Sequence, residues 1–228
     1  MITSHFNFES DIKKMLIAFL TSQINWANRL RYHNGSLGII TVDGTDFRVP
    51  RYGNHPKKYN SHKFKGKPGL RYEIAICIQS GDIVHINGPY PCGEKNDIQI
   101  FRLELKGKMR LGHELAEADL GYQGEPFYIE LPDMHGGGGK MQKKAKADAR
   151  SRHENCNKRF KEWAILNETY RHSEESHGKV FRAIAALIQI DLRSGNPLRS
   201  VEYRTILTPE RSSNLKYIRE KRRSRGLW

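Results

Sequence analysis

Cysteine is scarce in this sequence, and its spacing argues against two classes of protein. Only three cysteines occur, Cys77, Cys92 and Cys156, and no Cys-x-x-Cys pair is present. An odd and widely spaced set predicts neither a disulfide framework nor a zinc site. The ten histidines lack paired metal-ligand spacing, which disfavours zinc hydrolase chemistry. We therefore expect Cys77 and Cys156, which lie in apolar patterns, to be core residues.

Long apolar runs are absent as well. No stretch approaches the roughly 18 to 20 consecutive apolar residues of a membrane-spanning helix. Residues 1–20 contain Asp, Glu and paired Lys where a signal peptide would be apolar. The one low-complexity stretch, HGGGG at 135–139, predicts a flexible link. The sequence therefore predicts neither a transmembrane segment nor a secretory signal.

Acidic residues are few relative to basic ones. The 228 residues include 39 Lys and Arg against 25 Asp and Glu, a formal net charge of +14. Basic side chains gain free energy by releasing counterions condensed on nucleic acid, so a polyanion is the favoured large partner, although membrane surfaces attract basic proteins too. The length fits one main domain with a substantial core.

The apolar pattern predicts a series of strands followed by helices. We expect strands at 37–43, 71–78, 82–88, 115–119 and 127–131, and helices at 9–31, 96–109, 140–166 and 174–193. The segment 113–122 also fits the end of a helix, because Glu and Ala favour helix, and we assign it as strand. The basic tail at 214–228 has little to bury. It is typical of a nuclear address, a nucleic-acid arm or a solvated disordered segment.

The stretch TVDGTDFRVP at 41–50 places an acidic residue, Asp43, directly after the apolar run LGIITV. An unpaired carboxylate at the end of a core strand costs free energy unless a cation or backbone donors hold it. Asp-Gly is a strong hairpin signal, and FRV could be the returning strand. The alternative is a metal ligand, which needs matching carboxylates elsewhere in the chain.

The predicted helix at 140–166 carries two parallel stripes. Its buried stripe comprises Ala149, His153, Cys156, Phe160 and Trp163, where His153 is expected to be a satisfied core histidine. A second stripe, displaced by one residue, comprises Arg150, Glu154, Asn157 and Lys161. Glu154 is the lone carboxylate of this second stripe and stands between cations. A solvated, salt-bridged helix face would show the same pattern.

The order of elements predicts an α/β fold with a ribonuclease H-like mixed sheet of about five strands flanked by helices. In such a sheet the first and fourth strands lie side by side, so Asp43 and Asp119 would meet at their ends, and the long helix could add Glu154. Convergent carboxylates repel one another unless hard cations lie between them, and Mg²⁺ or Mn²⁺ suits oxygen ligands. Two such ions about 4 Å apart can promote phosphodiester cleavage.

Four short motifs then resemble one family. VDGT (42–45), GEKND (93–97), ADLGYQG (118–124) and RHENCNKRFK (152–161) occur in this order, with 34 residues between Asp119 and Glu154. Together they resemble the DDE endonuclease domain of Harbinger-type and related cut-and-paste transposases over residues 37–192. The resemblance implies a metal-dependent nuclease that cuts DNA at transposon ends and joins the freed 3′ hydroxyl to new DNA.

The resemblance also implies roles for individual residues. Asp43, Asp119 and Glu154 match the catalytic carboxylates and would bind Mg²⁺ or Mn²⁺. Asp97 matches a recurrent Asp of the family and receives a supporting role, although a carboxylate at a helix start often only caps N–H groups. Arg150 and Lys161 would orient Glu154 or contact phosphate, with an ordinary surface ion-pair ladder as the alternative. A further expectation is that Tyr122 packs beneath the site.

The Lys- and Gly-rich loop after the first strand is the expected DNA contact. Its basic residues are Arg51, Lys57, Lys58, Lys63, Lys65 and Lys67. We expect this loop to lie on the same side as the three carboxylates and to carry much of the affinity for DNA. A nuclear location is expected in a cell with a nucleus, and a cytoplasmic location otherwise.

The expected organisation has three parts: an N-terminal helix (1–34), the endonuclease domain (35–205) and a basic tail (206–228). Related transposases carry a DNA-recognition helix-turn-helix upstream. We therefore expect residues 1–34 to be the remnant of a longer upstream region, or DNA recognition to come from a separate protein, with an oligomer as a further option. Two other functions fit the sequence: a catalytically inactive or domesticated DNA-binding protein, and an RNA-cleaving ribonuclease H-like enzyme.

Overall fold

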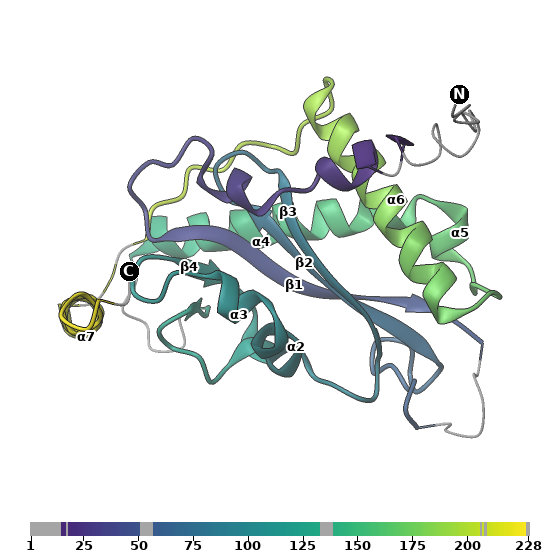
Figure 1. Ribbon diagram of the computed structural model, residues 1–228, viewed down its shortest axis with the longest axis horizontal. Helices are drawn as coiled ribbons and strands as arrows, with labels where there is room; N and C mark the ends of the chain where they lie inside the picture. Colours follow the sequence, from purple (N-terminus) through teal and green to yellow (C-terminus); the bar gives the residue numbers. More distant parts are fainter. Residues whose placement is uncertain are drawn as a thin grey trace, which may run out of the picture.

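A mixed five-stranded sheet forms the centre of the molecule, with helices on both faces (Figure 1). The computed structural model describes residues 15–16, 18–50, 57–132, 139–205, 207 and 209–226. The strands are β1 (Gly38–Arg48), β2 (Gly69–Cys77), β3 (Ile83–Pro91), β4 (Leu115–Glu117) and β5 (Ile129–Glu130), and the helices are η1 (Trp26–Leu30), α2 (Asp97–Leu103), α3 (Leu105–Lys108), η2 (Leu120–Tyr122), α4 (Lys140–Lys161), α5 (Ala164–Asn167), α6 (Glu174–Arg193) and α7 (Pro209–Arg223). The predicted α/β, ribonuclease H-like class is confirmed.

The sheet has the strand order β3-β2-β1-β4-β5. β1, β2 and β3 are antiparallel neighbours, whereas β4 runs parallel to β1 and β5 runs parallel to β4. Pairing between β1 and β4 ends at Thr41 and Glu117. β1 continues to Arg48, so the edge of β1 that β4 had covered is open to other groups beyond Thr41.

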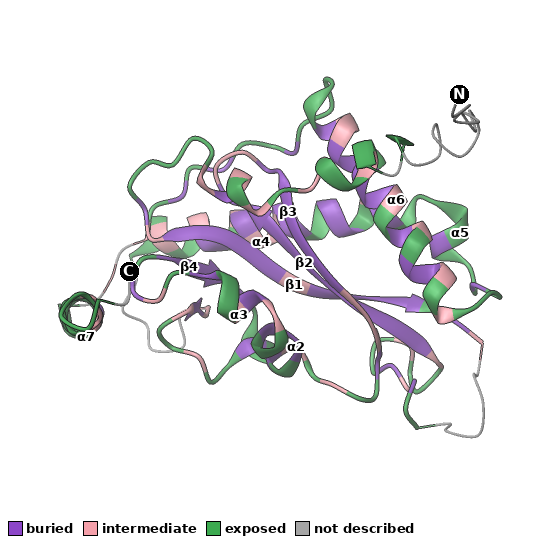
Figure 2. Ribbon diagram, viewed as in Figure 1, coloured by how far each residue is buried: buried purple, intermediate pink, exposed green. Residues whose placement is uncertain are grey.

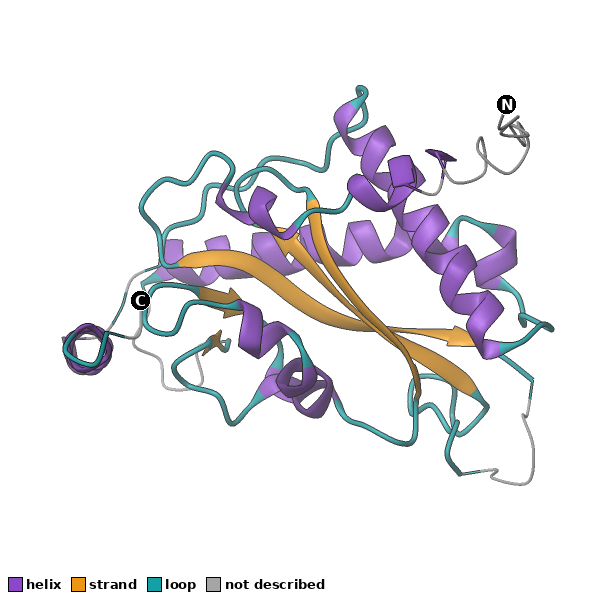
Figure 3. Cartoon of the chain, in the orientation of Figure 1, coloured by secondary structure: helices purple, strands orange, loops and turns teal. Residues whose placement is uncertain are grey.

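Each face of the sheet has its own core, because side chains alternate along a strand. On one face Ile74 and Ile76 of β2 pack with residues of α4, α5 and α6. On the opposite face Ala75 and Cys77 pack with residues of α2 and α3. The strands are almost entirely buried (Figure 2) and pass between the two helical layers (Figure 3). Cys77 is a core residue, as predicted.

The prediction that Asp43 ends the first strand is wrong. β1 runs five residues further, from Gly44 to Arg48, and pairs with β2 over that length. Neither Asp43 nor Gly44 has a positive φ, so the Asp-Gly pair forms no hairpin turn and FRV is not a returning strand. Asp46 tolerates its buried position in β1 because Arg71 and Ser61 hydrogen-bond its carboxylate.

Three helices differ in extent from their predictions. The described residues 15–16 and 18–22 are helical, but the chain then turns, and the extended Asn25 caps the separate 3-10 helix η1 by accepting a hydrogen bond from the Ala27 N–H. The helix expected at 96–109 divides at Glu104, whose φ of −138° is not helical. α4 ends at Lys161, so Trp163 lies beyond it and is 40% exposed, which corrects its assignment to the buried stripe.

Two further predictions concern the helix at 174–193 and the glycine-rich link. α6 has the predicted bounds, 174–193. Most of the glycine-rich link, 135–138, lies outside the described residues, and Gly139 precedes α4. No helix in the described part of the chain is long and apolar enough to cross a membrane.

The basic tail contains α7, which is attached to the domain. Leu215 of this helix is only 1% exposed, and the Arg219 guanidinium donates to the Gly112 carbonyl. Arg211 pairs with Glu130 of β5. The tail therefore buries little, as expected, since Leu215 is the one buried residue of α7, but this helix is docked on the domain by the contacts of Arg211 and Arg219.

Candidate active site

Asp43 lies in the middle of β1, half-buried, on the face that α4 covers. The Asn157 side-chain amide donates to Asp43 Oδ2 at 2.9 Å. Burial raises the pKa of Asp43, and the charge of Asp119 raises it further. Lys63, Lys161 and the backbone N–H of Gly44 oppose this effect. Asp43 therefore lies within electrostatic reach of the second predicted carboxylate and of two lysines.

Asp97 reaches the same place from the opposite face of the sheet. The capping of α2 is performed by Asn96, which forms a capping box with Gln99, so the Asp97 carboxylate is available for other contacts. Arg71 Nη1 donates to Asp97 Oδ1 at 3.0 Å. Burial raises the pKa of Asp97, Arg71 and Lys63 lower it, and the charges of Asp119 and Asp43 raise it. The three aspartates thus interact electrostatically.

Two glycines let these carboxylates approach the backbone. A Cβ on Gly44 would lie 2.5 Å from Asp97 Oδ1. A Cβ on Gly121 would lie 2.9 Å from Asp97 Oδ2 and 3.0 Å from Asp119 Oδ1. Asp97 and Asp119 therefore approach Gly121 together, and Asp97 also lies over the residue that follows Asp43.

Asp119 follows β4 by two residues instead of ending it. Its side chain caps η2, since Oδ1 accepts a hydrogen bond from the Gly121 N–H at 2.9 Å, and the residue is exposed. The early end of β4 places this carboxylate next to the uncovered edge of β1. Three aspartates therefore gather at that edge: Asp43 lies on β1 itself, Asp97 begins α2 and Asp119 caps η2.

Glu154 lies on α4, which runs along β1. His153 Nδ1 lies 2.7 Å from Thr41 Oγ1, and Asn157 contacts Asp43 one turn later. Glu154 falls between these two contacts and is exposed, and no described residue forms a hydrogen bond or ion pair with it. His153 is a core residue, as predicted, and burial lowers its pKa to about 3.

Arg150 and Lys161 form no ion-pair ladder with Glu154 within the described residues. Arg150 is directed toward β4, where its charge lowers the pKa of Glu117. Lys161 is exposed, and its charge lowers the pKa of Asp43. The two ends of the predicted stripe thus act on different groups, Arg150 on Glu117 of β4 and Lys161 on Asp43.

The basic loop reaches the site through Lys63, whose ammonium group donates to the Gly44 carbonyl. The loop is fixed because Ser61 Oγ donates to the buried Asp46 at 2.6 Å. Four further lysines are exposed, Lys57, Lys58, Lys65 and Lys67, and Arg51 lies outside the described residues.

A second layer of side chains supports the aspartates. Arg71 bonds Asp46 through Nε at 2.8 Å and Nη2 at 3.1 Å while it also holds Asp97. Glu73 is buried next to this group, where burial and the charge of Asp97 raise its pKa well above the usual range. Tyr122 is fully buried, in agreement with its predicted place beneath the site. Sequence reasoning missed Arg71 as a site residue. It identified Lys63 only as a DNA contact of the basic loop, and for Asn157 the only signal was its place in the second stripe.

An open cleft of about 910 Å³ extends from the site past the end of β1. Its walls are formed by residues 46–48, Phe64, Lys161 and residues 164–172. Arg48 lies over the Phe64 ring, with its Cζ 5.2 Å from the ring centroid. Lys161 lines this cleft, and its charge also lowers the pKa of Asp43, so the cleft and the candidate site share this residue.

The donor set fits a hard divalent cation. It offers carboxylate oxygens from neighbouring residues: the charge of Asp119 raises the pKa of Asp43 and of Asp97, an effect that a bound cation would offset. No group of three or more His, Cys, Asp or Glu side chains is arranged to hold a metal among the described residues. Asp97 and Asp43 instead accept hydrogen bonds from Arg71 and Asn157. A cation bound by Asp43 Oδ2 would replace the hydrogen bond from Asn157.

Comparison with known proteins agrees with the geometry. No curated protein and no solved structure matches the chain. A family model described as the transposase DDE domain matches residues 34–225. This match extends beyond the expected 37–192 to include α7, and it contains all four acidic residues discussed above. The chain therefore belongs to the family of transposase DDE domains.

Proposed function

We propose that the protein is a transposase-derived, metal-dependent DNA endonuclease of the Harbinger-type group, which cleaves phosphodiesters and transfers strands. The observation that carries this proposal is that the Asp97 and Asp119 carboxylates approach Gly121 together, while Asp97 also lies over Gly44, the residue next to Asp43. A protein that only bound DNA would gain nothing from gathering carboxylates where phosphate must lie. Family membership supports the same reaction class.

In this proposal Asp43, Asp119 and Glu154 hold Mg²⁺ or Mn²⁺. Two such ions would activate the attacking oxygen and stabilise the leaving oxygen. Asp43 gives up its bond from Asn157 to become a ligand, and Glu154 turns inward from its exposed position. Asp97 remains with Arg71 and supports the arrangement from the other face of the sheet.

The basic side chains around the carboxylates would position the DNA. Lys63 and Lys161 stand close enough to Asp43 to lower its pKa, so both could contact a phosphate next to the scissile bond. The cleft beyond β1 continues this positive surface with Arg48 and Arg171. Exposed lysines of the loop would contact the duplex further away, chiefly through its phosphates.

Nicking of supercoiled DNA tests the proposed function. Purified protein is expected to nick plasmid DNA in Mg²⁺ or Mn²⁺ and to lose this activity with EDTA and with Asp43→Ala. Wild-type protein that binds DNA but leaves it intact in both metals would contradict the proposal.

The second candidate is a DNA-binding protein that has kept the fold without catalysis. It is favoured by the bonds from Arg71 to Asp97 and from Asn157 to Asp43, which satisfy two carboxylates without a metal. Binding with no cleavage in either metal would support it. Preferential cleavage of RNA in a competition assay would instead indicate a ribonuclease.

A further inference from the structure

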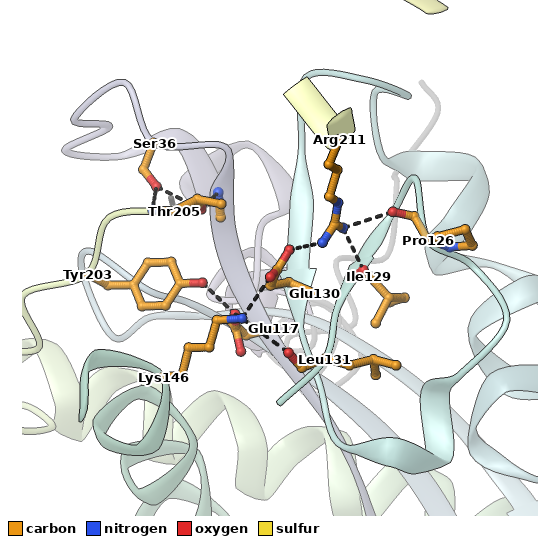
Figure 4. A network of polar contacts seen from close by, with 11 residues as sticks. Ser36, Glu117, Pro126, Ile129, Glu130, Leu131, Lys146, Tyr203, Thr205 and Arg211 are labelled. Carbon is orange, nitrogen blue, oxygen red and sulfur yellow. Dashed lines mark hydrogen bonds and ion pairs between the residues drawn. The ribbon is translucent and has the colours of Figure 1, made fainter. Parts of the chain in front are cut away.

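A buried group of charged and polar side chains lies at the end of the sheet that carries Asp119 (Figure 4). Glu117, two residues before Asp119, has 0% exposure, and Glu130 of β5 is also buried. Lys146 of α4 is 5% exposed. Charged residues are rarely buried unless they are paired, so these three require partners.

Lys146 joins α4 to β4 and to the edge strand β5. Its Nζ lies 2.7 Å from Glu130 Oε1 and 3.7 Å from Glu117 Oε1, and it donates to the Leu131 carbonyl at 3.1 Å. Lys146 precedes Glu154 by eight residues on the same helix, which corresponds to about 12 Å along the axis. The position of α4 over β4 is therefore fixed about two turns before Glu154.

The segment after α6 supplies the other partners. The Tyr203 hydroxyl donates to Glu117 Oε1, and Tyr203 itself is 3% exposed. Arg211 at the start of α7 pairs with Glu130 Oε2 and donates to the Ile129 carbonyl at 2.9 Å. Thr205 accepts from the Gly38 N–H at 2.6 Å, which attaches the same segment to the first residue of β1.

These contacts form one connected brace: Glu117, Glu130, Lys146, Tyr203 and Arg211. It joins β4, β5, α4 and α7, and it lies two residues before Asp119 and about two turns of α4 before Glu154. Burying several ionisable groups costs several kcal/mol per ion before pairing, and apolar side chains of similar volume are often at least as stabilising. Apolar side chains in place of the brace would thus stabilise the fold equally well. Hydrogen bonds and ion pairs differ because they are directional, and they define one placement of α4 relative to β4.

We propose that Tyr203 and Lys146 are positioning residues of the active site, which set the placement of Asp119 relative to Glu154 by fixing Glu117. The segment 203–211 is then part of the catalytic unit although it touches neither substrate nor metal. This inference rests on the proposed function. Partners of metal ligands commonly change metal affinity or activity by about 10- to 100-fold when removed.

Tyr203→Phe tests the brace, because it removes one hydroxyl and keeps the ring. We expect a fall of about 10-fold or more in Mn²⁺ affinity, measured by electron paramagnetic resonance of free Mn²⁺, and a similar fall in kcat for nicking. KM for DNA and DNA affinity in Ca²⁺ are expected to stay within about twofold, since no phosphate contact is lost. Tyr217→Phe on α7, where Tyr217 is 61% exposed, is the matched control and is expected to behave as wild type.

A second variant keeps the test decisive if Tyr203→Phe is poorly folded. Arg211→Gln removes the outermost partner of Glu130, since the Arg211 side chain is 25% exposed. This variant is expected to lower Mn²⁺ affinity several-fold while its circular dichroism spectrum stays unchanged. Wild-type Mn²⁺ affinity and kcat in both folded variants would overturn the brace and leave the proposed function standing. Failure of the wild-type protein to bind Mn²⁺ or nick DNA would overturn both.

Discussion

At the scale of single residues, the candidate site consists of carboxylates held by neutral or positive neighbours. Asn157 holds Asp43, Arg71 holds Asp97, and Lys63 lies over the Gly44 carbonyl between them. The sequence did not reveal which residues pair with which, because each contact joins segments that are far apart in the chain. The acidic residues themselves were identified from motifs and spacing.

Glu154→Gln is expected to remove cleavage while DNA affinity stays equal or rises slightly. Glutamine keeps the size and helix preference of the side chain, so α4 should persist. Loss of the anionic oxygens should lower the nicking rate by about 100-fold or more, and removing one negative charge should not weaken DNA binding. Nicking in Mg²⁺ and binding in Ca²⁺ measure the two effects.

The control for that experiment is Glu162→Gln, an exposed carboxylate at the end of the same helix. It should retain wild-type nicking and binding. Near-wild-type nicking by Glu154→Gln would show that Glu154 is not the third carboxylate.

Gly44→Ala tests whether Asp97 must approach the backbone of β1. The added Cβ would lie 2.5 Å from Asp97 Oδ1, so Asp97 must turn away and its bond from Arg71 must change. We expect a fall of about tenfold or more in nicking rate. Gly107→Ala, at a position with no atom within 4 Å of the added Cβ, should leave the rate unchanged. Equal rates for the two variants would remove the supporting role of Asp97.

At the scale of elements, the predicted bounds were correct where apolar residues repeat regularly. They were wrong where contacts with residues far away in the chain determine how far an element extends. α6 matches its prediction because Ser173 caps it and apolar residues repeat regularly to its end. β1 was predicted too short because the apolar run LGIITV ends at Asp43 and Asp-Gly is a turn signal, and Asp46 adds a second carboxylate to the strand. Asp46 is accommodated by Arg71, 25 residues away in the chain, and no local pattern reveals that pairing. α7 was missed as a docked helix because its only buried residue is Leu215.

The basic loop is the element expected to bind DNA. Neutralising Lys57 and Lys58 together, as Lys57→Gln and Lys58→Gln, removes two exposed charges near Lys63. Each lost phosphate contact should reduce the slope of log K against log salt by about 0.9 for duplex DNA. Titrations at several salt concentrations measure this slope. Lys179→Gln on α6, where Lys179 pairs with Glu175, is the control, and an unchanged slope in the double variant would show that the loop does not contact DNA.

At the scale of the whole molecule, two cores on opposite faces of one sheet contain buried histidines that stay neutral. Burial lowers the pKa of His85 and of His177 to about 4. In the unfolded chain these histidines bind a proton as the pH falls through about 6.5. In the folded chain they bind a proton only as the pH falls through about 4. The stability that each provides is therefore complete above about pH 6.5 and is lost as the pH falls toward 4.

His177→Gln should reduce this pH dependence. His177 Nδ1 lies 2.7 Å from the Tyr72 hydroxyl, and a glutamine amide can also bond there without titrating. Between pH 6.5 and 5 the free energy of unfolding of the wild type should fall by up to about 1.4 kcal/mol per pH unit more than that of the variant. Urea unfolding at several pH values measures the difference. His62→Gln, at an exposed loop position, is the control, and parallel curves for wild type and His177→Gln would contradict the prediction.

The attachment of segment 203–211 to β4 and β5 has a consequence for biosynthesis. β1, β4 and α4 all precede this segment, so a growing chain has made Asp43, Asp119 and Glu154 before it has made Tyr203 and Arg211. Until those residues leave the ribosome, Glu117 and Glu130 lack two of their partners. The order of translation thus makes the end of the sheet beside Asp119 acquire its native contacts late, after β1, β4 and α4 have been synthesised.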